Sequence, residues 1–409
     1  MALGNETVAA LENVLKTKYH DKCHLMAYEE DWFLQNVRKD LKFGGNDCRI
    51  SLRYGHSQGG SSTYTDADEG QTSSESAGFF LTRAKGYHLI SMDAEALLAG
   101  EGSENTVLNA VDAAMEGGTR MIGHALAIGV NGDGTGTRGI IDAATTLSGP
   151  VLKLKSVSTI INFERQQRYQ FADPVALTLR DSGDFLTVIG VDRDTGEVTF
   201  DGDLDDIAGI SVGDLVVRKG DFKKDIAGLA AWLPLDRTNL DDLFMQQDRS
   251  LDKTRLAGVM FDGEGNDKAD TLQRALTRLS REGGKDKNRV GLVNIETLAE
   301  ISIELGAKAH YYPAESGKGT AGFDTLIIST PRGMFKLVGS LLCPPEEFYI
   351  LDMSTWVLKS IKKAPHIVDD DGRTILRLPN SDAVGWRLRY FAQLGCDAPG
   401  WNLHGIWGT

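Results

Sequence analysis

The sequence predicts a mixed α+β protein with a small all-β domain inserted in its middle. Three stretches of the 409-residue chain support this prediction. Residues 103–130 show the apolar spacing of a long helix, residues 163–225 contain several short strand patterns, and residues 267–342 alternate helical and strand patterns. A chain of this length can bury enough surface for roughly two or three compact units.

The composition is that of an ordinary folded protein with an excess of acidic residues. Apolar residues make up 41% of the chain and charged residues 25%, and the net charge is −14. Phosphate groups are bound by clusters of Lys and Arg, so an acidic chain is poorly suited to hold nucleic acid tightly. We therefore expect any contact with DNA to be non-specific.

The sequence indicates no cofactor, metal site or membrane segment. Cys23, Cys48, Cys343 and Cys396 lack the C-x-x-C spacing of a zinc site and do not form a disulfide framework pattern. No apolar run is long enough to span a bilayer, and the first residues lack the pattern of a secretory signal. We expect the chain to fold in the cytoplasm.

The first 92 residues predict two appendages rather than a core. Residues 1–45 contain one short amphipathic helix pattern, Thr7–Thr17, and form either an arm that extends from the body or a helical cap on it. Residues 46–92 contain two strand patterns, Cys48–Tyr54 and Gly78–Ile90, joined by a long polar excursion. So long a hairpin tip usually has a function, and a disordered surface loop is the alternative explanation.

The helix predicted from Ser103 is long and ends abruptly. Its apolar residues fall near one stripe: Val107, Leu108, Val111, Met115, Ile122, Leu126 and Val130. Ser103 is expected to be the N-cap, and the Gly117-Gly118 pair at mid-length predicts a bend. The glycines beyond Val130 permit a sharp reversal of the chain. We interpret the following residues as a structural turn: Asn131, Gly132, Asp133, Gly134 and Gly136.

The middle of the chain changes to β-strand patterns. Residues 151–162 predict one strand after the turn. Phe185–Ile189 and Glu197–Phe200 flank Asp194-Thr195-Gly196, which is a hairpin turn signal. Several short strands in sequence predict a small β-barrel or β-sandwich over residues 163–225. An independent ligand-binding module is the competing explanation, but this segment lacks the aromatic and basic cluster that would support it.

The last part of the chain alternates helices and strands. The predicted elements are a helix over 267–282, a strand over Arg289–Val293, a helix over Ile295–Leu305, and strands over Thr325–Ser329 and Phe335–Leu342. Residues 351–409 add closing strands, one of which ends at Gly385–Tyr390. This order is typical of a helix-covered central sheet.

Three short motifs match functional signatures, but their surroundings do not. Gly55-His56-Ser57-Gln58-Gly59 matches G-x-S-x-G, in which a nucleophilic serine lies between a strand and a packed helix. The polar residues after Ser57 cannot form such a helix, so a serine hydrolase is kept as the alternative hypothesis. Gly134–Gly139 matches G-x-G-x-x-G but follows a helix, and residues 131–142 lack the final Glu of a calcium loop. We predict no catalytic, cofactor-binding or metal-binding residue.

The order of these elements resembles a known family. The long helix, closed by Asn131–Gly136 and followed by the apolar Gly139-Ile140-Ile141, is similar to the spine helix of tailed-bacteriophage major capsid proteins, which have the Hong Kong 97 fold. The closing strand over Gly385–Tyr390 and the ending Cys396–Asn402 are also similar to parts of that family. The resemblance lies in the order of elements more than in identical residues, and covers most of the chain.

The resemblance implies a domain organisation. The segments are an N-terminal arm over 1–45, an extended loop over 46–92, a peripheral domain with the spine helix over 93–162, the inserted β domain over 163–225, a peripheral connection over 226–266, an axial domain over 267–350, and closing strands over 351–409. In the family the arm and the loop lie on neighbouring subunits. We expect Tyr64, Asp66, Asp68 and Glu69 to contact a neighbour. No lysine occurs between Lys42 and Lys85, so the covalent cross-link that some relatives form through this loop is not expected.

The function implied by the resemblance is structural rather than enzymatic. Copies of the chain would self-assemble into the pentamers and hexamers of an icosahedral shell around phage double-stranded DNA. The spine helix would bend at its glycine pair in an immature shell. Further implied partners are a separate scaffolding protein, a portal and decoration proteins. The shell would assemble in the bacterial cytoplasm and become the virion capsid; a cellular nanocompartment shell of the same fold is a second alternative.

Overall fold

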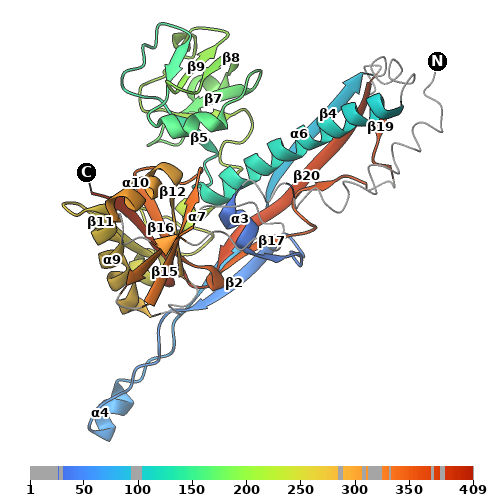
Figure 1. Ribbon diagram of the computed structural model, residues 1–409. Helices are drawn as coiled ribbons and strands as arrows, with labels where there is room; N and C mark the ends of the chain where they lie inside the picture. The colour runs from blue at the N-terminus through green and yellow to red at the C-terminus, as the bar shows by residue number, and fades with distance from the viewer. Residues whose placement is uncertain are drawn as a thin grey trace.

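The computed structural model of the chain describes residues 26, 31–93, 104–283, 289–305, 310–311, 325–330, 333–369, 373–377 and 383–408. Figure 1 shows a compact lobe around β16 (Glu347–Asp352), and a long arm formed by α6 (Glu104–Asn131), β4 (Ala84–Asp93) and β20 (Ala383–Cys396). A lobe of short strands lies beside the arm, and a hairpin carrying α4 (Tyr64–Glu69) extends away from the body. In the described part of the chain, no helix combines the length and the apolar character that a membrane crossing needs.

The compact lobe is built on a mixed sheet of strand order β11-β21-β16-β12-β15-β14-β13. Its other strands are β11 (Val259–Gly263), β12 (Arg289–Asn294), β13 (His310–Tyr311), β14 (Thr325–Thr330), β15 (Gly333–Ser340) and β21 (Leu403–Trp407). The helices α9 (Lys268–Leu279) and α10 (Ile295–Leu305) pack on this sheet with their apolar faces. The helices and strands predicted over residues 267–342 are confirmed, whereas β21 was not predicted and pairs with both β11 and β16.

A second mixed sheet runs along the arm, with β20 at its centre. β20 pairs antiparallel with β17 (Trp356–Ser360) and, over ten residue pairs, with β4. The short strands β1 (Arg38–Asp40), β18 (His366–Ile367) and β19 (Leu376–Arg377) extend this sheet. The helix α6 lies along β4 (Figure 1) and buries the stripe residues Val111, Met115, Ile122, Leu126 and Val130. The predicted long helix is confirmed with 28 residues, while Ser103 lies outside the described residues.

The segment that packs on this core begins nearer to the N-terminus than the sequence indicated. In α3 (Trp32–Asn36), Phe33 and Leu34 are fully buried. Asp31 caps α3 because its Oδ2 accepts from Leu34 N at 3.0 Å, and its Oδ1 accepts from Ser340 Oγ at 3.0 Å. Residues 31–43 therefore have partners within their own chain, as the alternative of a helical cap implies, and an arm over 1–45 stays a prediction. The helix predicted over Thr7–Thr17 lies outside the described residues.

The predicted hairpin is present, but its return strand is divided. β2 (Asp47–Arg53) pairs with β3 (Ser76–Thr82), and the chain then enters β4 to pair with β20 instead. The break falls at Arg83, whose Nη1 donates to Phe43 O at 3.3 Å and so turns the chain at the base of the hairpin. The single strand predicted over Gly78–Ile90 is therefore two strands, which belong to two different sheets.

The lobe of short strands is a closed barrel of strand order β5-β10-β7-β8-β9-β6. Its strands are β5 (Thr137–Ile140), β6 (Val151–Lys153), β7 (Arg168–Ala172), β8 (Leu186–Asp192), β9 (Glu197–Phe200) and β10 (Leu215–Arg218). The two ends of this order join because Lys155 N donates to Ile140 O and Asp142 N donates to Lys153 O, both at 2.9 Å. A barrel rather than a sandwich therefore forms, around Phe163, Tyr169, Phe171 and Phe200.

This barrel is larger than the predicted insertion over residues 163–225, because β5 and β6 precede that range. The strand predicted over 151–162 is also wrong in its second half, where Val157–Asn162 forms a 3₁₀ helix. The hydroxyl of Thr159 donates to Ser156 O at 2.7 Å. Such local side-chain bonds to the backbone compete with a strand.

The connecting segment, residues 226–266, packs against the hairpin base and the arm after the chain leaves the barrel. It contains α7 (Leu229–Trp232) and α8 (Lys253–Ala257). Trp232 is fully buried, and its Nε1 donates to Leu394 O in β20 at 3.1 Å. Its ring makes edge contacts with Phe79 and Phe244, at centroid distances of 4.9 and 5.2 Å. The base of the hairpin is thereby fixed to the body.

Candidate functional site

The tip of the hairpin is exposed. None of the residues of α4 is buried, and Tyr64 is 86% exposed. Asp66, Asp68 and Glu69 are also exposed. The residues expected to contact a neighbour thus lie together on one short helix, which the polar composition did not predict. A local hydrogen bond from the Thr63 hydroxyl to the Asp66 carboxylate stabilises its first turn.

Between β2 and α4 the hairpin continues as a ribbon without a hydrophobic core. Gly55 N donates to Glu75 O at 3.2 Å, and Glu75 N donates back to Gly55 O at 3.1 Å. Gln58 N donates to Thr72 Oγ1 at 3.0 Å, and Thr72 N donates to Gln58 O at 3.0 Å. A two-stranded hairpin alone is marginally stable in water. A surface that covered this ribbon would therefore stabilise it.

Ser57 lies on this exposed ribbon and lacks the setting of a nucleophile. The next helix is α4, which buries nothing, rather than a helix packed on a sheet. A nucleophilic serine also needs a histidine base. His366 Nδ1 lies 2.9 Å from Lys363 O, and His404 Nε2 lies 2.9 Å from Glu347 Oε2, so both of these imidazoles are engaged with other groups. The G-x-S-x-G match thus has no catalytic geometry among the described residues.

The glycine-rich segment after α6 is a tight turn. Gly134 and Gly136 have φ of +87° and +84°, which glycine adopts without strain. At Gly136 a side chain would also collide with Asp221 O, 2.8 Å from the position of its Cβ. Asp133 Oδ1 accepts from Thr135 N at 2.9 Å, and Asn131 Nδ2 donates to Ala127 O at 2.9 Å. These side chains stabilise the turn itself, and the second half of the G-x-G-x-x-G match forms the start of the strand β5 rather than of a helix.

The two glycines at the middle of α6 have different surroundings. α6 is continuous through both of them. Gly117 is exposed and faces open space, whereas Gly118 is buried against β4. A Cβ on Gly118 would lie 2.3 Å from Ile90 Cδ1 and 3.2 Å from His88 Cδ2. Gly118 is therefore required for close packing of the helix on β4, a role that the sequence pattern did not reveal.

A buried ion-pair network links the barrel strands β5 and β10 to the segment that follows β10. Arg138 Nη2 lies 3.0 Å from Asp221 Oδ2 and 3.2 Å from Asp225 Oδ2. Arg218 Nε lies 2.7 Å from the same Asp221 oxygen. Asn162 Nδ2 donates to Arg138 O at 2.9 Å. Burial raises the pKa of Asp225, although the charge of Arg138 opposes this effect.

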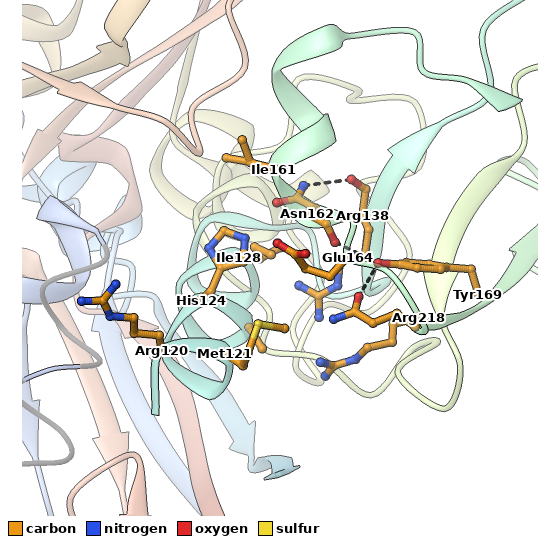
Figure 2. Close-up of a pocket in the computed structure, with 12 residues that line it drawn as sticks. Arg120, Met121, His124, Ile128, Arg138, Ile161, Asn162, Glu164, Tyr169 and Arg218 are labelled. Carbon is orange, nitrogen blue, oxygen red and sulfur yellow. Dashed lines mark hydrogen bonds between the residues drawn. The ribbon is translucent and has the colours of Figure 1, made fainter. Parts of the chain in front are cut away.

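A polar cavity of about 240 Å³ lies beside this network. Figure 2 shows His124 and Met121 of α6 on one side of it, and Asn162, Glu164 and Tyr169 of the barrel lobe on the other. Burial, with a contribution from the charge of Arg138, lowers the pKa of His124, so its imidazole is neutral at pH 7. Within the described structure, His124 Nε2 and Arg138 Nη1 are buried without a hydrogen-bond partner. The cavity thus lies at the interface between α6 and the barrel and is lined by polar side chains of both.

A basic groove lies on the other side of the network, between the hairpin base, β20 and the barrel. It has a volume of about 580 Å³. The cationic side chains that line it are Arg83, Lys85, Arg218, Lys219, Lys223 and Lys224. Two carboxylates, Asp221 and Asp225, also line it, and both are engaged in the ion-pair network. The groove is therefore positive on a chain that is acidic as a whole.

Sequence reasoning missed both the network and the basic groove. Arg138 and Asp225 are 87 residues apart, and Lys85 is more than 130 residues before Lys219. The run Lys219–Asp225 contains three lysines, and was the one local signal for a charged surface. Its partners come from other segments, so the pattern could not show what the run would face.

The fold is similar to that of solved capsid structures. A chain of the cyanophage A-1(L) capsid asymmetric unit matches with a TM-score of 0.50 and 11% identity, over 96% of this chain and 94% of that chain. At this identity the likeness shows the fold alone. The α+β capsid fold that the resemblance predicted is confirmed by this match.

Two further matches have lower TM-scores, and no argument rests on them. They are a chain from the capsid of a native GTA particle, with a TM-score of 0.45 and 5% identity over 94% of this chain and 91% of that chain, and a chain from the satellite phage P4 procapsid, with a TM-score of 0.40 and 11% identity over 100% and 98%. No protein-family model and no curated protein sequence matches the chain.

Proposed function

We propose that this chain is the major capsid protein of a tailed phage and self-assembles into the pentamers and hexamers of an icosahedral shell around double-stranded DNA. The observation that carries the proposal is the likeness of the fold to the cyanophage capsid chain over nearly the full length of both. The role is mechanical, and no residue is assigned to catalysis.

The exposed hairpin supports this proposal. Its base is anchored by buried side chains such as Phe79, but α4 and the ribbon below it bury no side chain in their own chain. Ordering such a segment costs conformational entropy that burial elsewhere must offset. A neighbouring copy would supply that burial, which is the expected behaviour of a protein shaped to contact its own copies.

The partners follow from the same proposal. Copies of the chain contact each other, and a separate scaffolding protein, a portal and decoration proteins complete the particle. The packaged DNA is contacted non-specifically, in line with the net charge of −14. Assembly takes place in the bacterial cytoplasm, and the mature location is the virion.

Electron microscopy of the purified protein, expressed alone and together with its scaffolding protein, tests the proposal. Closed icosahedral particles are the expected result, and DNA rather than an enzyme cargo inside virion particles separates a phage shell from a nanocompartment. A compact monomer at high concentration under both conditions, with the hairpin folded back on its own body, would overturn the proposal.

A hairpin deletion provides a second test. Arg53 pairs with Ser76 at the outer end of β2 and β3, so an Asn-Gly turn that replaces residues 54–75 preserves the register. We expect the variant to fold, as judged by circular dichroism, and to remain as soluble protomers or rings. Shells of normal shape and stability from this variant would contradict the intersubunit role of the loop.

A further inference from the structure

We propose that the acidic tip of the hairpin of one copy binds the basic groove of a neighbouring copy through ion pairs. The inference rests on the proposed shell-forming function, and adds to it the receiving surface and the chemistry of the contact. It follows from three features of the structure, which are the charge of the groove, the charge of the tip, and their placement, with the groove beside the base of the β2–β3 hairpin and the acidic helix at its far end.

The groove offers positive charge that its own chain leaves open. In the described part of the chain, Lys85, Lys219, Lys223 and Lys224 form no ion pair with a carboxylate. Lys219 lies over the ring of Phe185, with its Nζ 3.4 Å from the ring centroid. Lys219 is nevertheless exposed, so its ammonium is accessible to an anionic partner. Because the two carboxylates of the groove already neutralise Arg138 and Arg218, these lysines keep a net positive field.

The hairpin tip carries the complementary charge. From Tyr54 to Glu75, both included, the chain contains four carboxylates and no lysine or arginine. Three of the carboxylates, on Asp66, Asp68 and Glu69, are exposed on α4, and none forms an ion pair within the described chain. Exposed Tyr64 adds an amphipathic ring of the kind that interfaces favour.

The geometry excludes a contact between the tip and the groove of the same copy. The groove contains Thr82, which pairs with Asp47 at the base of the hairpin. The tip lies beyond Arg53 and Ser76, at the other end of the ribbon, and Figure 1 shows α4 pointing away from the barrel. Strands of 7 residues separate the ends by about 23 Å, and the ribbon adds to this distance.

Opposite charges at the two ends of one ribbon predict a head-to-tail contact. A surface that binds a different surface on an identical copy is heterologous, and such contacts close into rings when the rotation permits. The contact therefore explains how each hairpin can reach its neighbour around a ring, and it depends on charge rather than on a covalent bond. A nucleic acid is the competing occupant of the groove.

Charge reversal and charge exchange test the inference. The first variant is Lys223→Glu/Lys224→Glu, the second is Asp66→Lys/Glu69→Lys, and the third combines all four changes. Assembly is followed by sedimentation and electron microscopy over a range of protein concentrations, with circular dichroism as the folding check. The matched control is Lys153→Glu/Lys155→Glu, which reverses two exposed lysines of the barrel outside the groove.

We expect each double variant to raise the protein concentration needed for assembly by about tenfold, because attraction is replaced by repulsion at an exposed contact. The four-residue exchange should restore assembly, and added salt should weaken assembly of the parent and the exchange variant alike. The control should assemble as the parent does.

Failure of the exchange variant to recover, when both double variants are folded, would overturn the inference, as would unaltered assembly of the double variants. A loss of DNA binding by the lysine variant without a loss of assembly would assign the groove to nucleic acid and also overturn it. These results differ from failure of the proposed function, in which the parent chain itself forms no particles.

Discussion

Replacing Gly118 by alanine should destabilise the protein, whereas the same change at the adjacent Gly117 should stabilise it. Both glycines lie inside α6, so both substitutions gain the same helix propensity of about 1 kcal/mol. They differ in what the new methyl group meets. At Gly117 it meets nothing within 4 Å, and at Gly118 it meets the side chains of β4.

The structure sets the size of the difference. The new Cβ at position 118 would lie 2.3 Å from Ile90 Cδ1 and 2.6 Å from Ile90 Cγ1. Carbon atoms in favourable contact are about 3.5–4.0 Å apart, so Ile90 or the helix must shift by more than 1 Å. Overpacking of this kind costs about 1–3 kcal/mol. Because the propensity gain cancels, the two variants should differ by about that amount.

Urea unfolding of disassembled subunits, followed by circular dichroism, measures this difference. The midpoint of Gly117→Ala should rise and that of Gly118→Ala should fall relative to the parent, with equal slopes. A third variant, Ile90→Ala, removes the colliding atoms and provides a double-mutant cycle. In that background Gly118→Ala should no longer destabilise the subunit.

Equal stabilisation by both alanines would refute the packing argument, because it would mean that β4 does not restrict position 118. A destabilising effect of Gly118→Ala that persists in the Ile90→Ala background would also refute it. In either case the glycine pair would have to be explained by bending of α6 alone, which stays a prediction and is tested by comparing helix curvature in immature and expanded particles.

Three further predictions concern buried polar groups. Arg138→Leu should cost about 3–5 kcal/mol because it leaves the buried Asp225 carboxylate without its cation; a loss below about 1 kcal/mol in urea unfolding would contradict the pairing. Asn402→Ala should cost about 3 kcal/mol, since its Oδ1 accepts from Asp352 N at 2.8 Å and from a buried indole N–H at 2.9 Å; Asn402→Asp should not recover this loss, because a second carboxylate oxygen would replace the Nδ2 that donates to Ala398 O at 2.9 Å. Burial raises the pKa of Asp31 above 3.8, so its contribution to stability is present below that pH and is lost as the pH rises through the raised pKa. Asp31→Asn should therefore flatten the fall in unfolding free energy as the pH rises above 3.8, and an unchanged slope would contradict this assignment.

Periodic elements with one buried face could be predicted from the sequence. The apolar stripe of α6, the amphipathic α9 and the turn at Asp194–Gly196 each depend on residues that are close in the chain. The exposed tip was also located correctly, because a long polar excursion cannot build a core. Its short helix was not predicted, since Tyr64–Glu69 has no apolar face to reveal it.

Elements whose partners are distant in the chain could not be predicted. The apolar residues of the segment 31–43 indicate that it packs on something, but not whether that is its own chain or another. The pairing of β1 with β17 decided this. The barrel begins at Thr137, earlier than predicted. The sequence did not reveal β5 and β6 because both strands are short and become ordered only when the other strands pair with them.

By itself, then, the sequence determined the type and order of the main elements and the acidic character of the exposed tip, because periodicity and composition are local properties. Only the tertiary structure decided where charge and close packing occur. It brought Lys85 and Lys224 into one groove, Arg138 onto Asp225, and β4 against Gly118. Each of these depends on which segments fold together, and contacts between distant segments leave no periodic trace in the chain.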